Sequence, residues 1–262
     1  MTGPCPIRNW KLVLSYDGTT FHGWQVQPGL PTVQGVLASA VAHVTGEAVL
    51  PQGSGRTDTG VHAEGQVASF TLTSPIPAAN LLRALNRALP PTIRVLAAEP
   101  ATDDFHARRS ARGKTYQYRI HTAEPCPPWI APYVFACNLP LDLDAMQQAA
   151  QLVLGEHDFT SFAAADPDLH TRGNGAPPEH LPSNVRTIFT SDWQREDNSL
   201  LYTVRGSGFL HHMVRNLVGT FLDVGRGRTG ADEISAILAA QSRSAAGPTA
   251  PASGLFLMHV EY

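Results

Sequence analysis

Cysteine is scarce in this chain, and its three positions follow no pattern. Cys5, Cys126 and Cys137 form neither an even set nor a C-x-x-C pair, which argues against a disulfide framework and against a thiolate zinc site. The sequence also lacks any run near the roughly 18 apolar residues that a membrane helix needs, and it has no charged-then-apolar leader. These absences predict a soluble protein of the reducing cytoplasm with no membrane partner.

Charged residues are few, and positive charge is not in excess. They make up 16% of the chain, and 22 acidic residues against 19 basic ones give a formal charge of -3. That sum gives no support for a nucleic-acid partner. Lysine occurs only at Lys11 and Lys114, however, so 17 of the 19 basic residues are arginines. Because the planar guanidinium suits phosphate contacts and stacking on flat rings, the positions of the arginines matter more than their number.

The spacing of apolar residues predicts the order β-α-β-β-α-β for the N-terminal half. Trp10, Leu12 and Leu14 recur at every second position, as in a half-buried strand. A helix is expected between Thr32, a possible N-cap, and Gly46, a residue suited to end a helix. The other expected elements are a helix at 77–89 and strands at 10–16, 47–52, 66–72 and 93–98.

The rest of the chain, 262 residues in all, repeats that plan with a different sequence. We expect strands at 115–121, 185–193, 200–206 and 254–262, and helices at 143–154, 213–224 and 232–240. Since each half has the order of the ferredoxin-like motif, the predicted fold is α+β, with two ferredoxin-like domains, 1–104 and 105–262, and mainly antiparallel sheets. A catalytic cleft is expected between the halves, and 166–182 is expected to be an exposed loop.

A glycine-rich loop from Gly53 to His62 holds one arginine, Arg56, and one carboxylate, Asp58. Glycine lets backbone approach a ligand closely, although an aspartate in such a turn often only caps neighbouring amides. The loop lacks the spacing and the lysine of a phosphate-binding P-loop. Neither Ser54 nor Ser207 stands in the G-x-S-x-G turn of a hydrolase.

Basic residues gather in the segment 105–121, which contains no acidic residue. Tyr116 and Tyr118 lie between Lys114 and Arg119 of this segment, and aromatic rings set between cations commonly hold unstacked bases. The plainer interpretation is that both tyrosines are ordinary strand residues. The candidate phosphate contacts in this segment are Arg108, Arg109, Arg112 and Lys114.

Two adjacent histidines, His211 and His212, precede the predicted helix at 213–224. Their spacing does not suit two ligands of one ion on a helix, and no cysteine stands nearby, so we expect no metal. They are candidates for contact with RNA or for local packing. Arg215 is placed partly inside by its apolar neighbours, and a buried arginine needs an anion such as Asp58.

Seven runs, taken in order, make the chain similar to the tRNA pseudouridine synthase A (TruA) family over essentially its full length. The most specific are GRTDTGVH at 55–62 and GFLHHMVRN at 208–216. The others are YDGT with F and GWQ within 16–25, FHAR at 105–108, KTY at 114–116, VRTI at 185–188 and SGL at 253–255. The resemblance implies an isomerase that converts uridines 38, 39 and 40 of the tRNA anticodon stem-loop to pseudouridine, without a nucleotide or metal cofactor.

The resemblance also implies roles for single residues. Asp58 matches the catalytic aspartate and Arg215 the arginine that pairs with it. Tyr116 matches the tyrosine that stacks on the target base and moves a proton, and Arg56 the arginine that fills the space left by the flipped-out nucleotide. Whether Asp58 attacks the uracil, traps C1′ of the sugar or removes a sugar proton stays open. The family is dimeric, so we expect a homodimer bound to tRNA.

Two other functions fit some of these residues. A non-catalytic RNA-binding protein made of two ferredoxin-like modules would explain the arginines and tyrosines, but an acid such as Asp58 in an RNA cleft repels phosphate. A glycosidase acting on free nucleosides would need a second acid of raised pKa near Asp58, and the runs offer none. Local charge favours RNA, because 199–230 holds four arginines and one acid, Asp223, which predicts a positive cleft and an acidic outer face.

Overall fold

The computed structural model describes residues 7–165 and 183–262, which form two compact units. The first unit contains the chain up to Gln117 together with Pro127–Val134 and Ala252–Tyr262. The second contains Tyr118–Cys126 and Phe135–Pro251. Because the units exchange segments, they do not follow one boundary in the sequence, and the division into domains 1–104 and 105–262 stays a prediction. Cys5 and the expected loop at 166–182 lie outside the described residues.

The sheet of the first unit is built around β1 (Arg8–Tyr16), which pairs antiparallel with β3 (His62–Leu72) and with β4 (Ile93–Ala101). Trp10, Leu12 and Leu14 are fully buried, which confirms the alternation read from the sequence. The strand order is β4-β1-β3-β10-β5, with β2 paired to β3. The remaining bounds are β2 (Gln52–Gly53), β5 (Gly113–His121) and β10 (Leu255–Glu261).

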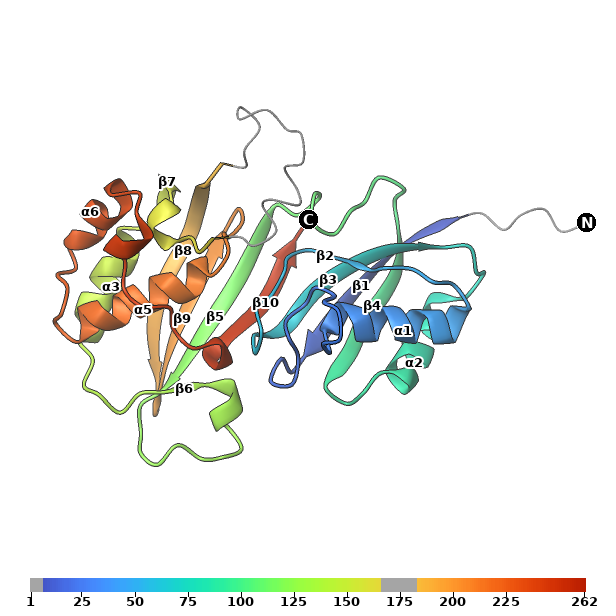
Figure 1. The fold of residues 1–262 in the computed structure, drawn as a ribbon, viewed down its shortest axis with the longest axis horizontal. Helices are drawn as coiled ribbons and strands as arrows, with labels where there is room; N and C mark the ends of the chain where they lie inside the picture. Colours follow the sequence, from blue (N-terminus) through green and yellow to red (C-terminus); the bar gives the residue numbers. More distant parts are fainter. Residues whose placement is uncertain (1–6, 166–182) are drawn as a thin grey trace, which may run out of the picture. The chain divides into compact units, whose positions relative to one another are not determined.

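Two helices, α1 (Val33–Thr45) and α2 (Ala78–Ala88), pack together in the first unit (Figure 1). The Thr32 side chain accepts a hydrogen bond from the Gly35 amide, and Gly46 ends α1 with a φ of 76°. Both ends of the predicted helix are therefore confirmed, and each has its expected physical cause.

The second unit has the strand order β5-β9-β8-β7, with β6 beside β5. The helices α3 and α5 pack together, and Leu217 and Phe221 of α5 are fully buried. The bounds are β6 (Phe135–Ala136), α3 (Leu143–Gln151), β7 (Gly155–Asp158), β8 (Val185–Glu196), β9 (Ser199–Gly206), α5 (Met213–Gly225) and α6 (Glu233–Ala239). Short 3-10 helices lie at Ala131–Tyr133, Thr160–Phe162, Arg243–Ala245 and Ala252–Gly254. The predicted α+β class with mainly antiparallel strands is confirmed.

The last strand lies between β5 and β3 in the strand order. Its place beside β5, the first strand of the predicted second half, is as expected, whereas its pairing with β3 was not predicted. β10 belongs to the first unit and pairs parallel with β3, with Phe256 opposite His62. Gly65 of β3 makes this approach possible, because a Cβ there would stand only 2.3 Å from the carbonyl oxygen of Met258. The missing side chain lets the two backbones come together.

Two predicted elements also have different bounds in the structure. The stretch 47–52 forms a ladder only at β2, since Glu47 instead accepts hydrogen bonds from the Thr73 and Ser74 amides through its carboxylate. The helix expected at 143–154 ends at Gln151, and Gly155, with a φ of 91°, begins β7 rather than ending a helix. Pairing with β8 takes this segment away from the helix.

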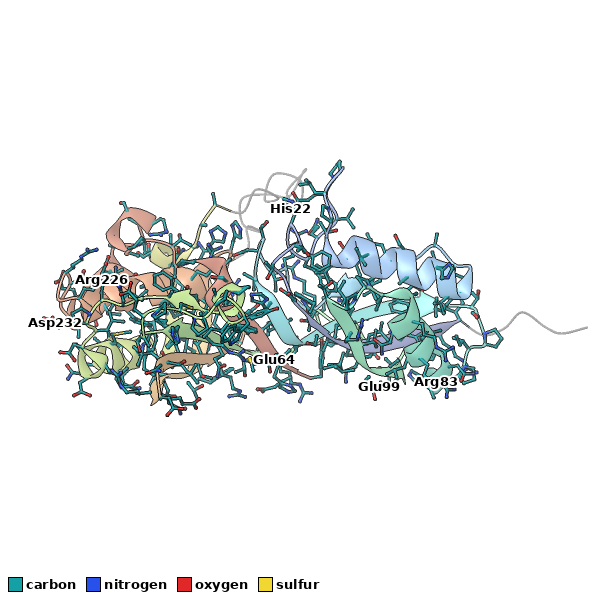
Figure 2. All side chains as sticks on the ribbon, turned by 90° about the horizontal axis from the view of Figure 1, so that it is seen from below. His22, Glu64, Arg83, Glu99, Arg226 and Asp232 are labelled. Carbon is teal, nitrogen blue, oxygen red and sulfur yellow. The ribbon has the colours of Figure 1, made fainter. Side chains whose placement is uncertain are left out.

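Figure 2 shows the side chains of both units. Arg83 on α2 and Glu99 on β4 belong to the first unit, and Arg226, which follows α5, belongs to the second.

Cys126 and Cys137 are free thiols. Within residues 7–165 and 183–262, none of the helices combines the length and the hydropathy required to cross a bilayer.

Candidate functional site

Asp58 lies in a turn that is held closely against the segment following β1. Its carbonyl oxygen accepts a hydrogen bond from the Val61 amide at 3.1 Å. A Cβ on Gly18 would stand 2.0 Å from the Val61 carbonyl oxygen, and one on Gly23 would stand 2.5 Å from that of Thr57. Two of the runs singled out in the sequence, 16–25 and 55–62, thus meet here, and glycine is required for their contact.

Buried polar side chains fasten the residues just before Asp58. The Tyr16 hydroxyl lies 2.8 Å from Thr57 Oγ1. Gln66 of β3 donates from Nε2 to the Gly55 carbonyl oxygen at 3.0 Å and accepts at Oε1 from the Ser54 hydroxyl at 2.7 Å. Because Gln66 and Ser54 are fully buried, these bonds are shielded from competition with water.

Tyr116 and Lys114 of β5 reach the same loop. A Cβ on Gly55 would stand 3.1 Å from Lys114 Nζ and 3.9 Å from the Tyr116 hydroxyl oxygen. Burial raises the pKa of Tyr116, and the nearby Tyr16 and Asp58 add to that rise. Tyr116 is therefore a neutral phenol at neutral pH, close enough to Asp58 to be influenced by its charge. The structure brings the predicted Asp58, Tyr116 and Lys114 together within the first unit.

Lys114, which was predicted to contact phosphate, also makes a hydrogen bond within the protein. Its Nζ donates to the Ser54 carbonyl oxygen at 2.7 Å, and the side chain is partly buried. An ammonium group has three donors, so this bond is compatible with a phosphate contact but does not support one. Its role in phosphate binding stays a prediction.

The arginines predicted to contact RNA in the first unit are exposed. Arg56 is exposed in the loop beside Asp58, and Arg112 is exposed just before β5. Arg108 and Arg109 are exposed on a turn, in which His106 Nδ1 accepts from their amides at 3.1 and 3.4 Å. Burial and the two arginine charges lower the pKa of His106, so its ring stays neutral and keeps accepting these bonds.

Arg215 lies in the first turn of α5 in the second unit and is half-buried. Its Nε donates to the Ala250 carbonyl oxygen at 2.7 Å, and the Ala250 amide donates to the Arg215 carbonyl at 3.1 Å. These two bonds fix the backbone and the stem of the guanidinium. Asp58 belongs to the other unit, so the Asp58–Arg215 pair stays a prediction.

His211 and His212 are half-buried at the start of α5, with ring centroids 3.9 Å apart. His211 Nδ1 lies 2.9 Å from the Ala165 carbonyl oxygen. His212 has a φ of 59°, a left-handed conformation that is uncommon outside glycine. These local contacts hold the two histidine rings in place. Their contact with RNA stays a prediction.

Gln66 and Tyr16 were not among the residues predicted for the site. A signal for Gln66 was present, because a polar residue occupies the face of β3 that Ala68, Phe70 and Leu72 mark as buried. A buried amide needs hydrogen-bond partners, and the polar loop preceding β3 is a natural place to find them.

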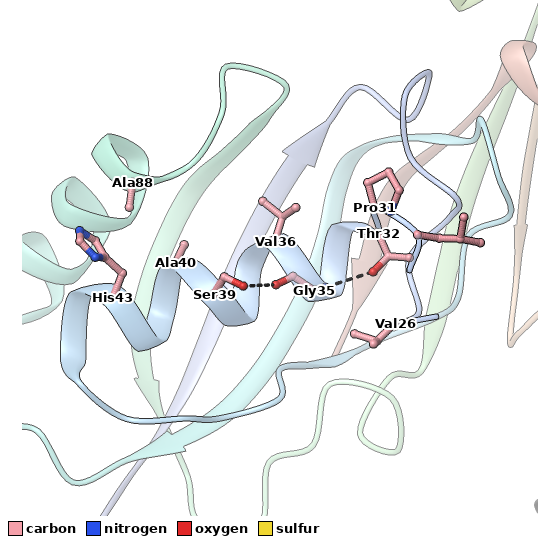
Figure 3. Close-up of a pocket in the computed structure, with 10 residues that line it drawn as sticks. Val26, Pro31, Thr32, Gly35, Val36, Ser39, Ala40, His43 and Ala88 are labelled. Carbon is pink, nitrogen blue, oxygen red and sulfur yellow. Dashed lines mark hydrogen bonds between the residues drawn. The ribbon is translucent and has the colours of Figure 1, made fainter. Parts of the chain in front are cut away.

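A groove of about 510 Å³ on the outer side of α1 is a separate feature (Figure 3). None of the predicted site residues lines it. Thr32 and Ser39 there bond to the Gly35 amide and carbonyl of the helix itself. The lining residues are Val26, Leu30, Pro31, Thr32, Gly35, Val36, Ser39, Ala40, His43 and Ala88.

Comparison with known proteins identifies a family that covers most of the chain. The chain matches the family model described as tRNA pseudouridine synthase over residues 12–108 and 149–262. It is 50% identical over 256 residues to tRNA pseudouridine synthase A of Solibacter usitatus, across 98% of this chain and 100% of that relative. It is 45% identical to tRNA pseudouridine synthase A of Bacillus pumilus, across 96% and 98%.

The fold and these matches define an RNA-modifying isomerase. The chain belongs to the tRNA pseudouridine synthase family. A solved structure of a Cbf5-Nop10-Gar1 complex matches 81% of this chain and 45% of its own, with 14% identity and a TM-score of 0.35, a likeness too slight to carry an argument.

Proposed function

We propose that this enzyme converts uridines 38, 39 and 40 of the tRNA anticodon stem-loop to pseudouridine, with Asp58 as its reacting carboxylate. The observation that carries the proposal is the placement of Asp58 in a fastened loop, beside the neutral phenol of Tyr116. The reaction breaks the N-glycosidic bond, turns the uracil and forms a C–C bond at C5. It consumes no electrons and no group donor, so we expect neither a metal nor an organic cofactor.

Each group in the first unit has a proposed task that fits its surroundings. Asp58 attacks the uracil, traps C1′ of the sugar or removes a sugar proton. Tyr116 stacks on the target base and relays the proton that leaves C5, its oxygen accepting that proton while its own hydroxyl proton passes on to a neighbouring base. Arg56, exposed beside Asp58, occupies the space that the flipped-out nucleotide leaves. Flipping costs a few kcal/mol by general estimates.

The remaining candidates bind or orient. The exposed Arg108, Arg109 and Arg112 hold backbone phosphates, for which guanidinium groups are well suited. Arg215 pairs with Asp58 and orients its carboxylate. Lys114, His211 and His212 are weaker candidates for RNA contact, since each already has a local contact within its unit.

We also propose a homodimer, so that one tRNA touches both subunits, and a cytoplasmic location, which a tRNA substrate favours. A non-catalytic RNA-binding module is the competing function. It accounts for the exposed arginines but gives no reason for the fastened loop around Asp58.

The test is release of tritium from C5-labelled uridine in an unmodified tRNA transcript. Wild type should release tritium, and Asp58→Asn should release none while still binding the transcript. Asp192→Asn is the matched control, because that carboxylate lies on β8 of the second unit and contacts Gln147; it should retain release. Binding without release in wild type would favour the RNA-binding module.

A further inference from the structure

The side chain of Gln66 is hydrogen-bonded to several groups in and around the loop that precedes Asp58. A carboxamide offers two N–H donors and an oxygen with two lone pairs. Nε2 of Gln66 donates to the Gly55 carbonyl oxygen at 3.0 Å and to the Tyr16 hydroxyl oxygen at 3.4 Å. Oε1 accepts from the Ser54 hydroxyl at 2.7 Å and from the Val67 amide at 3.1 Å. All four positions are used by a fully buried side chain.

The contacts form a directed chain that reaches the residue before Asp58. Burial raises the pKa of Tyr16 to about 12, so its hydroxyl keeps its proton at neutral pH. Because Gln66 Nε2 donates to the Tyr16 oxygen, the Tyr16 proton is available to Thr57 Oγ1, 2.8 Å away. The loop is thus held at Ser54, Gly55 and Thr57 by groups anchored on β1 and β3.

We propose that Gln66 is a positioning residue for the reaction: its carboxamide, acting through Tyr16 and the loop, fixes the place of Asp58. This inference rests on the proposed function. Two titratable groups of β5 lie next to the network. Lys114 bonds the Ser54 carbonyl oxygen, and Tyr116 lies near enough to Tyr16 for that residue to raise its pKa. Gln66 touches no reacting atom, so its effect falls on the chemical step and not on capture of the RNA.

The experiment compares Gln66→Met with Gln34→Met in the full chain. Gln34 is a buried glutamine of the same unit whose amide bonds the Pro51 carbonyl oxygen and the Val26 amide, outside residues 54–57. Three quantities are measured for each variant: the single-turnover rate of pseudouridine formation, the Kd for tRNA and the melting temperature. Small displacements of a reacting group cost up to about 100-fold in rate.

Gln66→Met should lower the single-turnover rate roughly 30-fold and leave the Kd for tRNA near that of wild type. Gln34→Met should lower the melting temperature and keep the single-turnover rate. Equal rate losses in the two variants would show general destabilisation and overturn the inference, as would a Gln66→Met enzyme with the wild-type rate. A wild type that formed no pseudouridine would instead overturn the proposed function, and the inference with it.

Gln66→Glu supplies a second measurement if Gln66→Met folds poorly. Burial raises the pKa of a carboxyl group, and only its protonated form can donate to the Gly55 carbonyl oxygen. The rate of Gln66→Glu, divided by that of wild type at the same pH, should therefore rise as the pH falls from about 8.5 to about 6. A ratio that stayed constant over this range would contradict the positioning role.

Discussion

The hydroxyl oxygen of Tyr16 lies 2.8 Å from Oγ1 of Thr57, the residue immediately before Asp58, and both side chains are buried. The second unit contains a pair of the same kind, in which the Tyr202 hydroxyl lies 2.8 Å from the Ser191 hydroxyl, also with both side chains buried. The two pairs have the same chemistry and the same burial. They differ in that one adjoins the proposed reacting carboxylate.

Tyr16→Phe and Tyr202→Phe should each lower the free energy of unfolding by about 1 kcal/mol for the buried hydroxyl–hydroxyl bond that is lost. Tyr16→Phe also removes the 3.4 Å bond from Gln66 Nε2, so its loss should be the larger of the two. Only Tyr16→Phe should also lower the turnover number, since only this bond positions the loop of Asp58. Urea unfolding and the rate of pseudouridine formation measure the two effects. A Tyr202→Phe enzyme that lost as much turnover as Tyr16→Phe would contradict the distinction.

The buried tyrosines make the protein sensitive to high pH. Burial raises the phenol pKa values of Tyr16, Tyr116, Tyr118 and Tyr202 in the folded state. The unfolded chain loses these protons near pH 10, so their contribution to stability is complete below about pH 10 and is lost as the pH rises toward the folded values.

Urea midpoints should therefore fall between about pH 9 and pH 11, and Tyr202→Phe should reduce the slope of that fall. An equal slope in wild type and Tyr202→Phe would argue against a raised pKa for Tyr202.

The raised pKa of Tyr116 also means that its ionisation should not appear in the pH profile of turnover at or below neutral pH.

Arg109→Ala should weaken tRNA binding and reduce the slope of log K against log salt by about 1, because one phosphate contact is removed. Turnover at saturating tRNA should change little. Arg83→Ala is the control, since Arg83 is exposed on α2 and bonds Asn80 of the same helix. Filter binding at several salt concentrations measures both slopes, and equal slopes in the two variants would remove Arg109 from the RNA-binding surface.

Arg215→Ala should lower turnover by roughly 100-fold or more, with a smaller loss of tRNA binding, because the proposed ion pair orients Asp58 for the chemical step. Arg195→Ala, which removes an exposed arginine of β8, is the control for a general loss of positive charge. Steady-state kinetics and Kd measurements separate the effects. Unchanged turnover in Arg215→Ala would eliminate the proposed ion pair.

Gly65→Ala should destabilise the first unit by about 2 kcal/mol, because its Cβ would force β10 away from β3. Thr71→Ala, at an exposed position of the same strand, should cost about 0.5 kcal/mol. Thermal unfolding compares the two. A Gly65→Ala protein as stable as Thr71→Ala would show that the strands separate easily.

Local structure followed from the sequence wherever one short pattern controlled it. The alternation in β1 and the two ends of α1 are set by neighbouring residues, and the structure confirms them. The partner of β10 depends instead on contacts between segments far apart in the chain, which periodicity does not reveal.

The candidate site shows the same division. Asp58 and Tyr116 could be named from short motifs, and the structure places both in the first unit. The role of Gln66 requires knowing that β1, β3 and the loop converge, since no motif contains all its partners. The positions of the arginines could be read from the sequence. The hydrogen bond from Lys114 to the Ser54 carbonyl oxygen could not be predicted from it.

The place of β10 has a consequence for synthesis on the ribosome. β10 follows every element of the second unit in the sequence, yet it pairs with β3 of the first. During translation β3 therefore emerges long before its parallel neighbour, and the end of its edge that pairs with β10, at His62 and Ala63, stays open while the whole second unit is being made. The nascent chain acquires the complete first sheet only after the second unit has left the ribosome, so a stall late in translation would release a protein in which the β10-pairing end of β3 has an open, aggregation-prone edge.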